Sequence, residues 1–166
     1  MRRKAKSARS QAPDQEAARQ KCLRLLGLRA RSAGELRDRL KSAGFDQEVI
    51  AVVLSDLASA GLVDDEEFAR SWVASRLAAG SAGRRKLRWE LRRKGISEDL
   101  IRCVVDQEID DDVELQLATQ LARRRLRGLP PEEKTLVRLR RALLGRGFGF
   151  GTVETVLRHL ARQMEH

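Results

Sequence analysis

Residues 35–54 read ELRDRLKSAGFDQEVIAVVL, and this stretch decides the fold because it recurs twice further along the chain. The second copy, KLRWELRRKGISEDLIRCVV, begins at Lys86, and the third, RLRRALLGRGFGFGTVETVL, begins at Arg138. The starting positions 35, 86 and 138 give a spacing of 51 and then 52 residues. Repetition at a fixed period is the signature of an array of similar supersecondary units.

Each copy is predicted to form a helical hairpin. In the first copy, Leu36 and Leu40 are four residues apart, so they lie on one face of a helix. Gly44 follows, and glycine adopts without a clash the left-handed conformation that ends a helix. Asp46 is placed as the N-cap of the next helix, which carries a second apolar stripe. The predicted corners of the three hairpins are Gly44, Gly95 and Gly147.

The residue that caps the second helix of each hairpin differs among the copies. It is Asp46 in the first copy, Ser97 in the second and Gly149 in the third. Because glycine has no side chain to accept a hydrogen bond, the start of the last helix is the least well defined of the three.

A further amphipathic helix precedes each hairpin, over residues 15–26, 65–77 and 111–126. Capping-box spacing joins Ser32 to Glu35 and Asp64 to Glu67. The pair Pro130–Pro131 suits the start of the helix that follows it. No segment alternates with the period of two that indicates a strand.

These patterns predict an all-α protein, an elongated array of three tandem three-helix repeats. The predicted organisation is a disordered basic tail over residues 1–14, followed by repeats over residues 15–61, 62–109 and 110–166. The tail lacks the apolar stretch of a secretory signal and only faintly resembles a transit peptide.

Composition narrows the class of function. The longest apolar run, residues 49–54, is too short to span a bilayer, so no membrane partner is expected. A formal net charge of +10 favours polyanions or acidic protein surfaces as partners. Cys22 and Cys103 both fall in apolar-periodic segments, which predicts two buried thiols in a reducing compartment and no disulfide.

No pattern indicates catalysis, a metal or a cofactor. His159 and His166 have no partner in sequence, and the acidic run 106–114 fits helix capping better than a calcium loop. GRGFGFG, residues 145–151, follows no strand and lacks the lysine-serine ending of a phosphate loop. We therefore expect a protein that is not an enzyme and binds no metal or cofactor.

Residues 83–95 form an unusually basic helix with a tryptophan on its outer face. Leu87 and Leu91 point to the core, and Trp89 points nearly opposite. Trp89 either stacks on a base or anchors a protein interface, or it is packed by a neighbouring repeat with arginines on its ring. A solvated basic face is the alternative for each cluster. The candidate contacts to a partner or DNA are Arg84, Arg85, Lys86, Arg88, Trp89, Arg92, Arg93, Arg123, Arg124, Arg125, Arg127, Arg138 and Arg141.

Two consecutive stretches resemble the central signature of the RecX family, regulatory proteins of the RecA recombinase. They are LVDDEEFARSWVASRL, residues 62–77, and GRRKLRWELRRKGIS, residues 83–97. Residues 31–45 and 139–157 also resemble repeats of that family, and the likeness extends over residues 19–162. The third copy departs from the family pattern at Gly149, where a polar cap is usual.

The resemblance implies a bacterial or organellar protein with three tandem three-helix repeats and no enzymatic activity. It implies binding to the RecA–DNA filament along its groove. We expect a cytoplasmic monomer that contacts DNA weakly or as part of the filament. Such binding would limit filament extension and suppress strand exchange, ATP hydrolysis and co-protease activity in DNA repair and the SOS response.

Two other functions remain open from the residues alone. The glycine corners superficially suggest a helix-turn-helix protein whose target is DNA itself, and such a protein would bind DNA without RecA in a salt-dependent way. The third possibility is a helical adaptor with an unknown acidic partner. A pull-down with such an adaptor as bait would recover a protein other than RecA.

Overall fold

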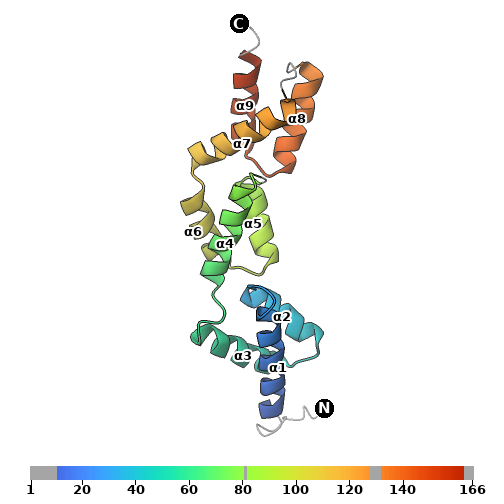
Figure 1. Cartoon of the computed structure of the whole chain (residues 1–166), viewed down its shortest axis with the longest axis vertical. Helices are drawn as coiled ribbons and strands as arrows, with labels where there is room; N and C mark the ends of the chain where they lie inside the picture. Colours follow the sequence, from blue (N-terminus) through green and yellow to red (C-terminus); the bar gives the residue numbers. More distant parts are fainter. Residues whose placement is uncertain (1–10, 81, 128–131, 163–166) are drawn as a thin grey trace, which may run out of the picture. The chain divides into compact units, whose positions relative to one another are not determined.

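The computed structural model describes residues 11–80, 82–127 and 132–162, and these residues form nine α-helices and no strand (Figure 1). The helices follow one another as three consecutive groups of three, so the all-α prediction and the three tandem three-helix repeats are confirmed. The bounds are α1 Gln11–Leu26, α2 Ala33–Ser42, α3 Gln47–Ser59, α4 Asp65–Ala78, α5 Arg84–Arg93, α6 Glu98–Glu108, α7 Asp111–Leu126, α8 Glu133–Gly145 and α9 Phe150–Arg162.

The chain divides into two compact units, and each is described by itself. Unit 1 contains the described residues up to Phe68 together with Lys94–Ile96. Unit 2 contains Ala69–Arg93 and the described residues from Ser97 onward. The glycine corner of the second repeat is therefore grouped with the first repeat.

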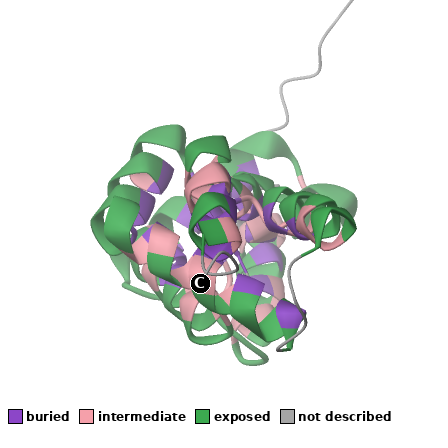
Figure 2. Cartoon of the chain, turned by 90° about the horizontal axis from the view of Figure 1, so that it is seen from above, coloured by how far each residue is buried: buried purple, intermediate pink, exposed green. Residues whose placement is uncertain are grey.

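The core of unit 1 lies among α1, α2 and α3. Leu36 and Leu40 of α2 are fully buried, as the leucine spacing predicted, and Leu57 of α3 is fully buried with them. Figure 2 shows buried residues on one side of the helices and exposed residues on the other. Burying each such leucine contributes about 1.5–3 kcal/mol, so this stripe is what makes the short α2 stable.

In unit 2, the last repeat builds a second core from α7, α8 and α9. Leu143, Phe148 and Val153 are fully buried there, and Ala118 of α7 faces them. Phe148 follows the corner glycine and folds back onto α8, where its N–H donates to the Leu143 carbonyl at 3.3 Å. This bond is the one expected where a helix ends at a left-handed glycine.

The three predicted glycine corners are confirmed. Gly44, Gly95 and Gly147 have φ of +86°, +76° and +82°, in the left-handed region that glycine adopts without steric cost. Each ends the first helix of its hairpin, and the second helix begins within a few residues.

Most of the predicted caps also form. The hydroxyls of Ser32 and Ser97 accept from Glu35 N and Leu100 N, at 3.1 and 3.4 Å. The Asp64 carboxylate accepts from Glu67 N at 3.0 Å. Asp46 occupies the N-cap of α3, but its side chain makes no capping hydrogen bond.

One boundary differs from the prediction, one agrees with it, and one lies outside the described residues. α1 begins at Gln11, so residues 11–14 are helical rather than part of a disordered tail. Pro13 is tolerated there because N–H groups in a first turn have no intrahelical partner. α9 begins at Phe150, directly after Gly149. Pro130 and Pro131 fall outside the described residues.

The two cysteines differ in exposure, which corrects the prediction that both are buried. Cys22 is fully buried, and burial raises the pKa of its thiol although Lys21 opposes this. Cys103 is exposed, because Ile101, Val104 and Val105 occupy the buried face of α6. Within the described residues, no helix has both the length and the apolar character needed to cross a bilayer.

Candidate functional site

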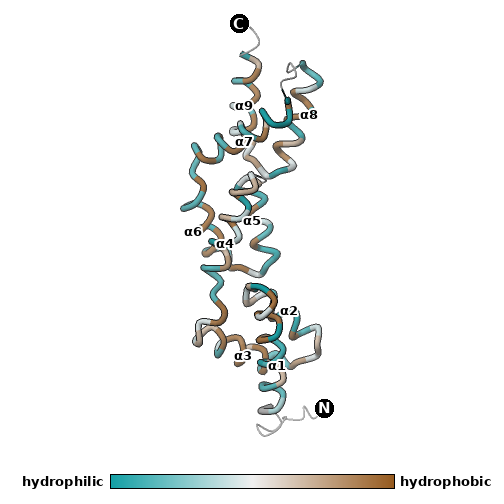
Figure 3. Tube along the Cα trace, viewed as in Figure 1, coloured by the Kyte–Doolittle hydropathy of each residue, from teal (hydrophilic) through white to brown (hydrophobic). Residues whose placement is uncertain are grey.

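The basic helix α5 buries one face and exposes another, as the sequence predicted. Leu87 and Leu91 are fully buried, whereas Trp89 is 49% exposed. Figure 3 shows hydrophilic residues over much of α5. The outer face of α5 is therefore a cationic surface that carries an aromatic ring.

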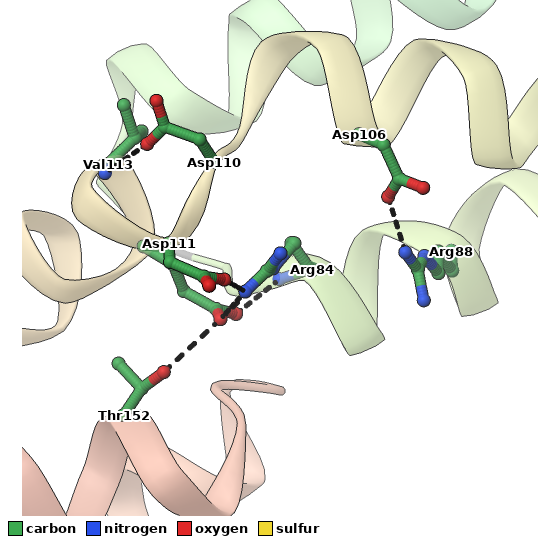
Figure 4. Close-up of polar contacts among 8 residues, drawn as sticks. Arg84, Arg88, Asp106, Asp110, Asp111, Val113 and Thr152 are labelled. Atoms are coloured by element: carbon green, nitrogen blue, oxygen red, sulfur yellow. Dashed lines mark hydrogen bonds and ion pairs between the residues drawn. The ribbon is translucent and has the colours of Figure 1, made fainter.

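Arg84, at the start of α5, is bound to a buried carboxylate. Its Nε and Nη2 atoms donate to Glu114 Oε2 at 3.1 and 2.9 Å, and its backbone N–H donates to Glu114 Oε1 at 3.1 Å. Nη2 also pairs with Asp111, and the hydroxyl of Thr152 on α9 donates to Glu114 at 3.3 Å (Figure 4). The hydrogen bond to Glu114 is the largest cause that raises the pKa of Arg84.

This arrangement gives Arg84 a structural role. The side chain of Glu114 is only 2% exposed, and that of Arg84 is 25% exposed. A buried carboxylate is stable only when its oxygens are hydrogen-bonded, and Arg84 supplies most of those bonds. Arg84 therefore ties α5 to α7, so a contact with a partner would have to compete with this tie.

Two other candidates on α5 form ion pairs at the surface. Arg88 pairs with Asp106 of α6, and Arg92 pairs with Glu98 through contacts that include 2.9 Å from Nη2 to Oε2 (Figure 4 shows the first pair). The hydrogen bond from Arg92 is the largest cause that lowers the pKa of Glu98. Exposed pairs of this kind are weak and can be exchanged for contacts with a partner.

The remaining basic residues of α5 have no acidic partner among the described residues. Arg85 is exposed, Lys86 is half-buried, and Arg93 is exposed with its guanidinium 4.9 Å from the centre of the Trp89 ring. One arginine therefore stacks on a ring that is still half exposed, and a role of Trp89 in stacking on a base or anchoring a partner stays a prediction.

The other predicted clusters lie on α7 and α8. Arg123, Arg124, Arg125 and Arg127 are exposed at the C-terminal end of α7, where cations also stabilise the helix dipole. Arg138 and Arg141 are exposed on α8. Their role as contacts stays a prediction.

A groove adjoins the exposed face of α5. It has a volume of about 600 Å³ and is lined by Arg85, Lys86 and Trp89 of α5, Leu144 and Gly145 of α8, Gly147, and Phe150 of α9. The described lining residues include none of the arginines of the α7 and α8 clusters. The structure therefore brings together three of the predicted site residues and adds Leu144 and Phe150, which the sequence analysis did not single out.

Backbone contacts hold the start of α5 against the glycine corner of the third repeat. Gly83 N donates to Arg146 O at 2.9 Å, and Arg85 N donates to Gly147 O at 3.1 Å. A Cβ on Gly147 would lie 2.4 Å from the backbone nitrogen of Lys86. The corner glycine therefore serves both the turn and the close approach of α5.

A similar contact occurs within unit 1. The hydroxyl of Ser32 donates to the carbonyl of Lys94, the residue before the corner glycine of the second repeat. A Cβ on Gly34 would lie 2.5 Å from that carbonyl oxygen. The Lys94 ammonium lies 2.8 Å from Glu35, which also pairs with Arg29 at 2.9 Å.

The charge of Glu35 is strongly stabilised by these two cations. Burial opposes its ionisation, but the hydrogen bonds from Arg29 and Lys94 outweigh burial and lower its pKa from 4.5 to about 2. Glu35 therefore stays ionised until the solution is strongly acidic.

A third network fixes the back of α5. Glu90 is 8% exposed, and its Oε2 accepts from Trp72 Nε1 at 2.9 Å and from Arg76 Nε at 2.8 Å. The Arg76 guanidinium also lies 4.8 Å from the centre of the Trp72 ring. Glu90 thus holds α5 to α4.

The described part of the chain holds no group of three or more His, Cys, Asp or Glu residues placed to bind a metal ion. His159 is exposed on α9, and His166 lies outside the described residues.

Family models and relatives agree on the identity of the repeats. Residues 18–57, 64–104 and 112–157 match the models of the first, second and third three-helix domains of RecX. Proteins named "Regulatory protein RecX" include one from Mycobacterium sp. (strain KMS), 41% identical over 80% of this chain and 76% of its own length. Another, from Amycolatopsis mediterranei (strain U-32), is 39% identical over 88% of this chain and 84% of its own length.

Solved structures support the fold. The crystal structure of RecX from Lactobacillus salivarius matches with a TM-score of 0.79 and 20% identity, over 90% of this chain and 98% of its own. A second crystal structure, of regulatory protein RecX, matches with a TM-score of 0.75 and 27% identity, over 89% of this chain and 73% of its own. By three domain matches and close relatives over most of its length, this chain belongs to the RecX family.

Proposed function

We propose that this chain is a non-enzymatic, monomeric regulator that binds the RecA–DNA filament in its groove and limits its recombinase, ATPase and co-protease activities. The observation that carries the proposal is the identity of about 40% with proteins named Regulatory protein RecX. The exposed cations of α5 supply a surface that suits a nucleoprotein partner.

The proposed activity requires binding alone. A ligand shifts an equilibrium only by the difference between its affinities for the two states. A protein that binds one form of the filament better than another therefore changes filament length and the ATP hydrolysis that depends on it. No reactive group of the chain is needed for that effect.

Within α5, the structure favours Arg85, Lys86 and Arg93 as the first contacts. They have no acidic partner among the described residues, so a partner can bind them without breaking an existing pair. Arg88 and Arg92 can join after exchanging Asp106 and Glu98 for acidic groups of the partner. Arg84 contributes indirectly by holding the helix in place.

The test is an ATPase titration. Purified protein is added to RecA, ATP and single-stranded DNA, and the rates of ATP hydrolysis and strand exchange are measured. A fall in both rates at sub-stoichiometric or equimolar protein supports the proposal, and unchanged rates refute it.

A matched pair of variants locates the contact. The double variant Arg85→Glu/Arg93→Glu should need about tenfold more protein for the same inhibition, because each reversed charge repels the partner. The double variant Arg158→Glu/Arg162→Glu on α9 is the control, since both arginines are exposed and lie outside the groove and the change in net charge is the same. An equal loss of inhibition in both variants would show that the effect depends only on the net charge of the protein.

Direct binding to DNA is the second candidate, favoured by the exposed ring of Trp89 beside Arg85 and Lys86, which have no acidic partner among the described residues. It predicts an affinity for oligonucleotides without RecA that falls steeply as salt rises. Binding to DNA that persists in RecA's absence, together with an unchanged RecA ATPase rate, would favour it.

A further inference from the structure

The groove beside α5 is apolar at three positions where the other repeats are polar. Trp89 corresponds to Asp38 in the first copy and Arg141 in the third, when the copies are aligned from Glu35, Lys86 and Arg138. In the same alignment, Leu144 corresponds to Lys41 and Arg92.

Phe150, in turn, corresponds to Gln47 and Glu98. The fold of a repeat therefore requires no apolar side chain at any of the three positions.

These three exceptional residues converge on one groove in unit 2, although they come from different helices. Trp89 is 49% exposed, Leu144 36% and Phe150 63%. All three line the groove of about 600 Å³. Large apolar side chains that are exposed together, without a structural need, indicate a surface that is covered by a partner.

The remaining lining is cationic or backbone. Arg85 and Lys86 line the groove beside the apolar residues, and no acidic side chain is among the described residues that line it. Gly145 has open space where a Cβ would lie, so a partner can approach the main chain closely there. One apolar side chain of the partner would occupy part of the groove, against the apolar residues, and carboxylates next to it would meet the two cations.

The ring of Trp89 helps to choose between a peptide and a nucleic acid. Arg93 already stacks at 4.9 Å from the ring centre, so part of the ring is covered. Leu144 offers no flat surface for stacking, and the polar edge of a base would lose hydrogen bonds to water against Leu144 and Phe150. An aliphatic or aromatic side chain of a protein has no such groups to leave unsatisfied.

We propose that this groove binds an acidic segment of a protein partner through one inserted Phe or Leu side chain. The inference deepens the proposed function, on which it rests for the partner's identity, by naming the chemistry of the contact. The groove is the apolar anchor, and Arg85 and Lys86 provide the charge complementarity that orients the segment.

The probe is a short fluorescein-labelled peptide of Asp and Glu around one central Phe, titrated with the full chain in the absence of RecA. Fluorescence polarisation measures its affinity, and the indole N–H signals of the protein report the site by NMR. The Trp89 signal should shift, and that of Trp72, which is bonded to Glu90, should stay in place.

The variant uses a residue that the repeat already accepts. Phe150→Gln copies Gln47 of the first repeat, and it should weaken peptide binding about tenfold while leaving the thermal unfolding unchanged. Val137→Gln is the control, because Val137 is 48% exposed on α8 outside the groove. It should bind the peptide as the parent chain does.

Three results would overturn the inference. One is equal binding of a matched peptide with Ala in place of the central Phe. Another is equal weakening by Val137→Gln. The third is a shift of the Trp89 signal by oligothymidylate but not by the peptide, which would assign the groove to nucleic acid. Peptide binding with an unchanged RecA ATPase rate would instead support the groove and refute the proposed function.

Discussion

Arg84 of α5 and Glu114 of α7 form an ion pair in which Nη2 and Nε both donate to the same carboxylate oxygen, at 2.9 and 3.1 Å. The two residues are 30 positions apart, and the pair connects the second repeat to the third within unit 2. Glu114 also accepts from the backbone N–H of Arg84. One carboxylate therefore caps the start of α5 and also holds the side chain of Arg84, the first residue of that helix.

Removing that carboxylate should destabilise unit 2. We expect Glu114→Ala to lower the free energy of unfolding by about 3 kcal/mol, because Arg84 and the start of α5 lose their buried acceptor. Urea unfolding followed by circular dichroism measures the change. Asp111→Ala should cost less than about 0.5 kcal/mol, because Asp111 is 92% exposed. Equal effects would contradict the structural role of Glu114.

The corner glycines should differ in their tolerance of alanine. Gly147→Ala should lower the free energy of unfolding by more than about 3 kcal/mol, since the new Cβ would meet Lys86 N at 2.4 Å in addition to the strain at φ +82°. The Cβ of Gly44→Ala would meet no atom within 4 Å. This variant should therefore lower the free energy of unfolding by only about 1 kcal/mol, from the backbone strain at φ +86°. Thermal unfolding compares the two, and a larger loss for Gly44→Ala would refute the double role of Gly147.

Acid should weaken unit 1 through Glu35. Its pKa in the folded chain, about 2, is below its ordinary value of 4.5, so its contribution is complete above pH 4.5 and is lost as the pH falls toward 2. We expect the charge of Glu35 to contribute about 1–2 kcal/mol to the free energy of unfolding. This value is below what the full pKa shift corresponds to, because Arg29 is 46% exposed and solvent screens the pair.

Urea unfolding of the parent chain and of Glu35→Gln, at several pH values, checks this prediction. The difference between them should shrink as the pH falls from 4.5 toward 2. Glu133→Gln on α8 is the control. A difference that is constant across this range would contradict the role of the Glu35 charge.

The two thiols should react at very different rates. Cys103 is exposed and should be modified by a thiol reagent in the native protein, whereas buried Cys22, whose thiol pKa is raised, should react only after unfolding. The variants Cys22→Ser and Cys103→Ser assign the fast and slow phases. Fast native modification of Cys103→Ser would contradict the packing of α1.

The sequence predicts those parts of the fold that local spacing determines. Leu87 and Leu91 lie four apart, so their burial and the outward position of Trp89 follow from helix geometry. The helix ends at Gly95 and Gly147 are predictable in the same way, because few residues other than glycine adopt the positive φ found there.

The site was predicted less completely because it depends on long-range pairing. All of the arginines near Arg84 look alike in sequence, yet Arg84 is bound to Glu114 and Arg85 is not. Phe150 lies in the glycine-rich stretch 145–151, from which no contact was predicted, although its polar counterparts Gln47 and Glu98 were a usable signal. The exposure of Cys103 was missed because an apolar-periodic segment also contains positions on its outer face.

The junction at Gly147 is built from main-chain atoms, through the donors Gly83 N and Arg85 N and the acceptors Arg146 O and Gly147 O. Main-chain geometry is nearly indifferent to which side chains stand beside it. Duplicated copies can therefore keep one way of joining while each acquires its own surface, so that architecture and recognition evolve as separate traits.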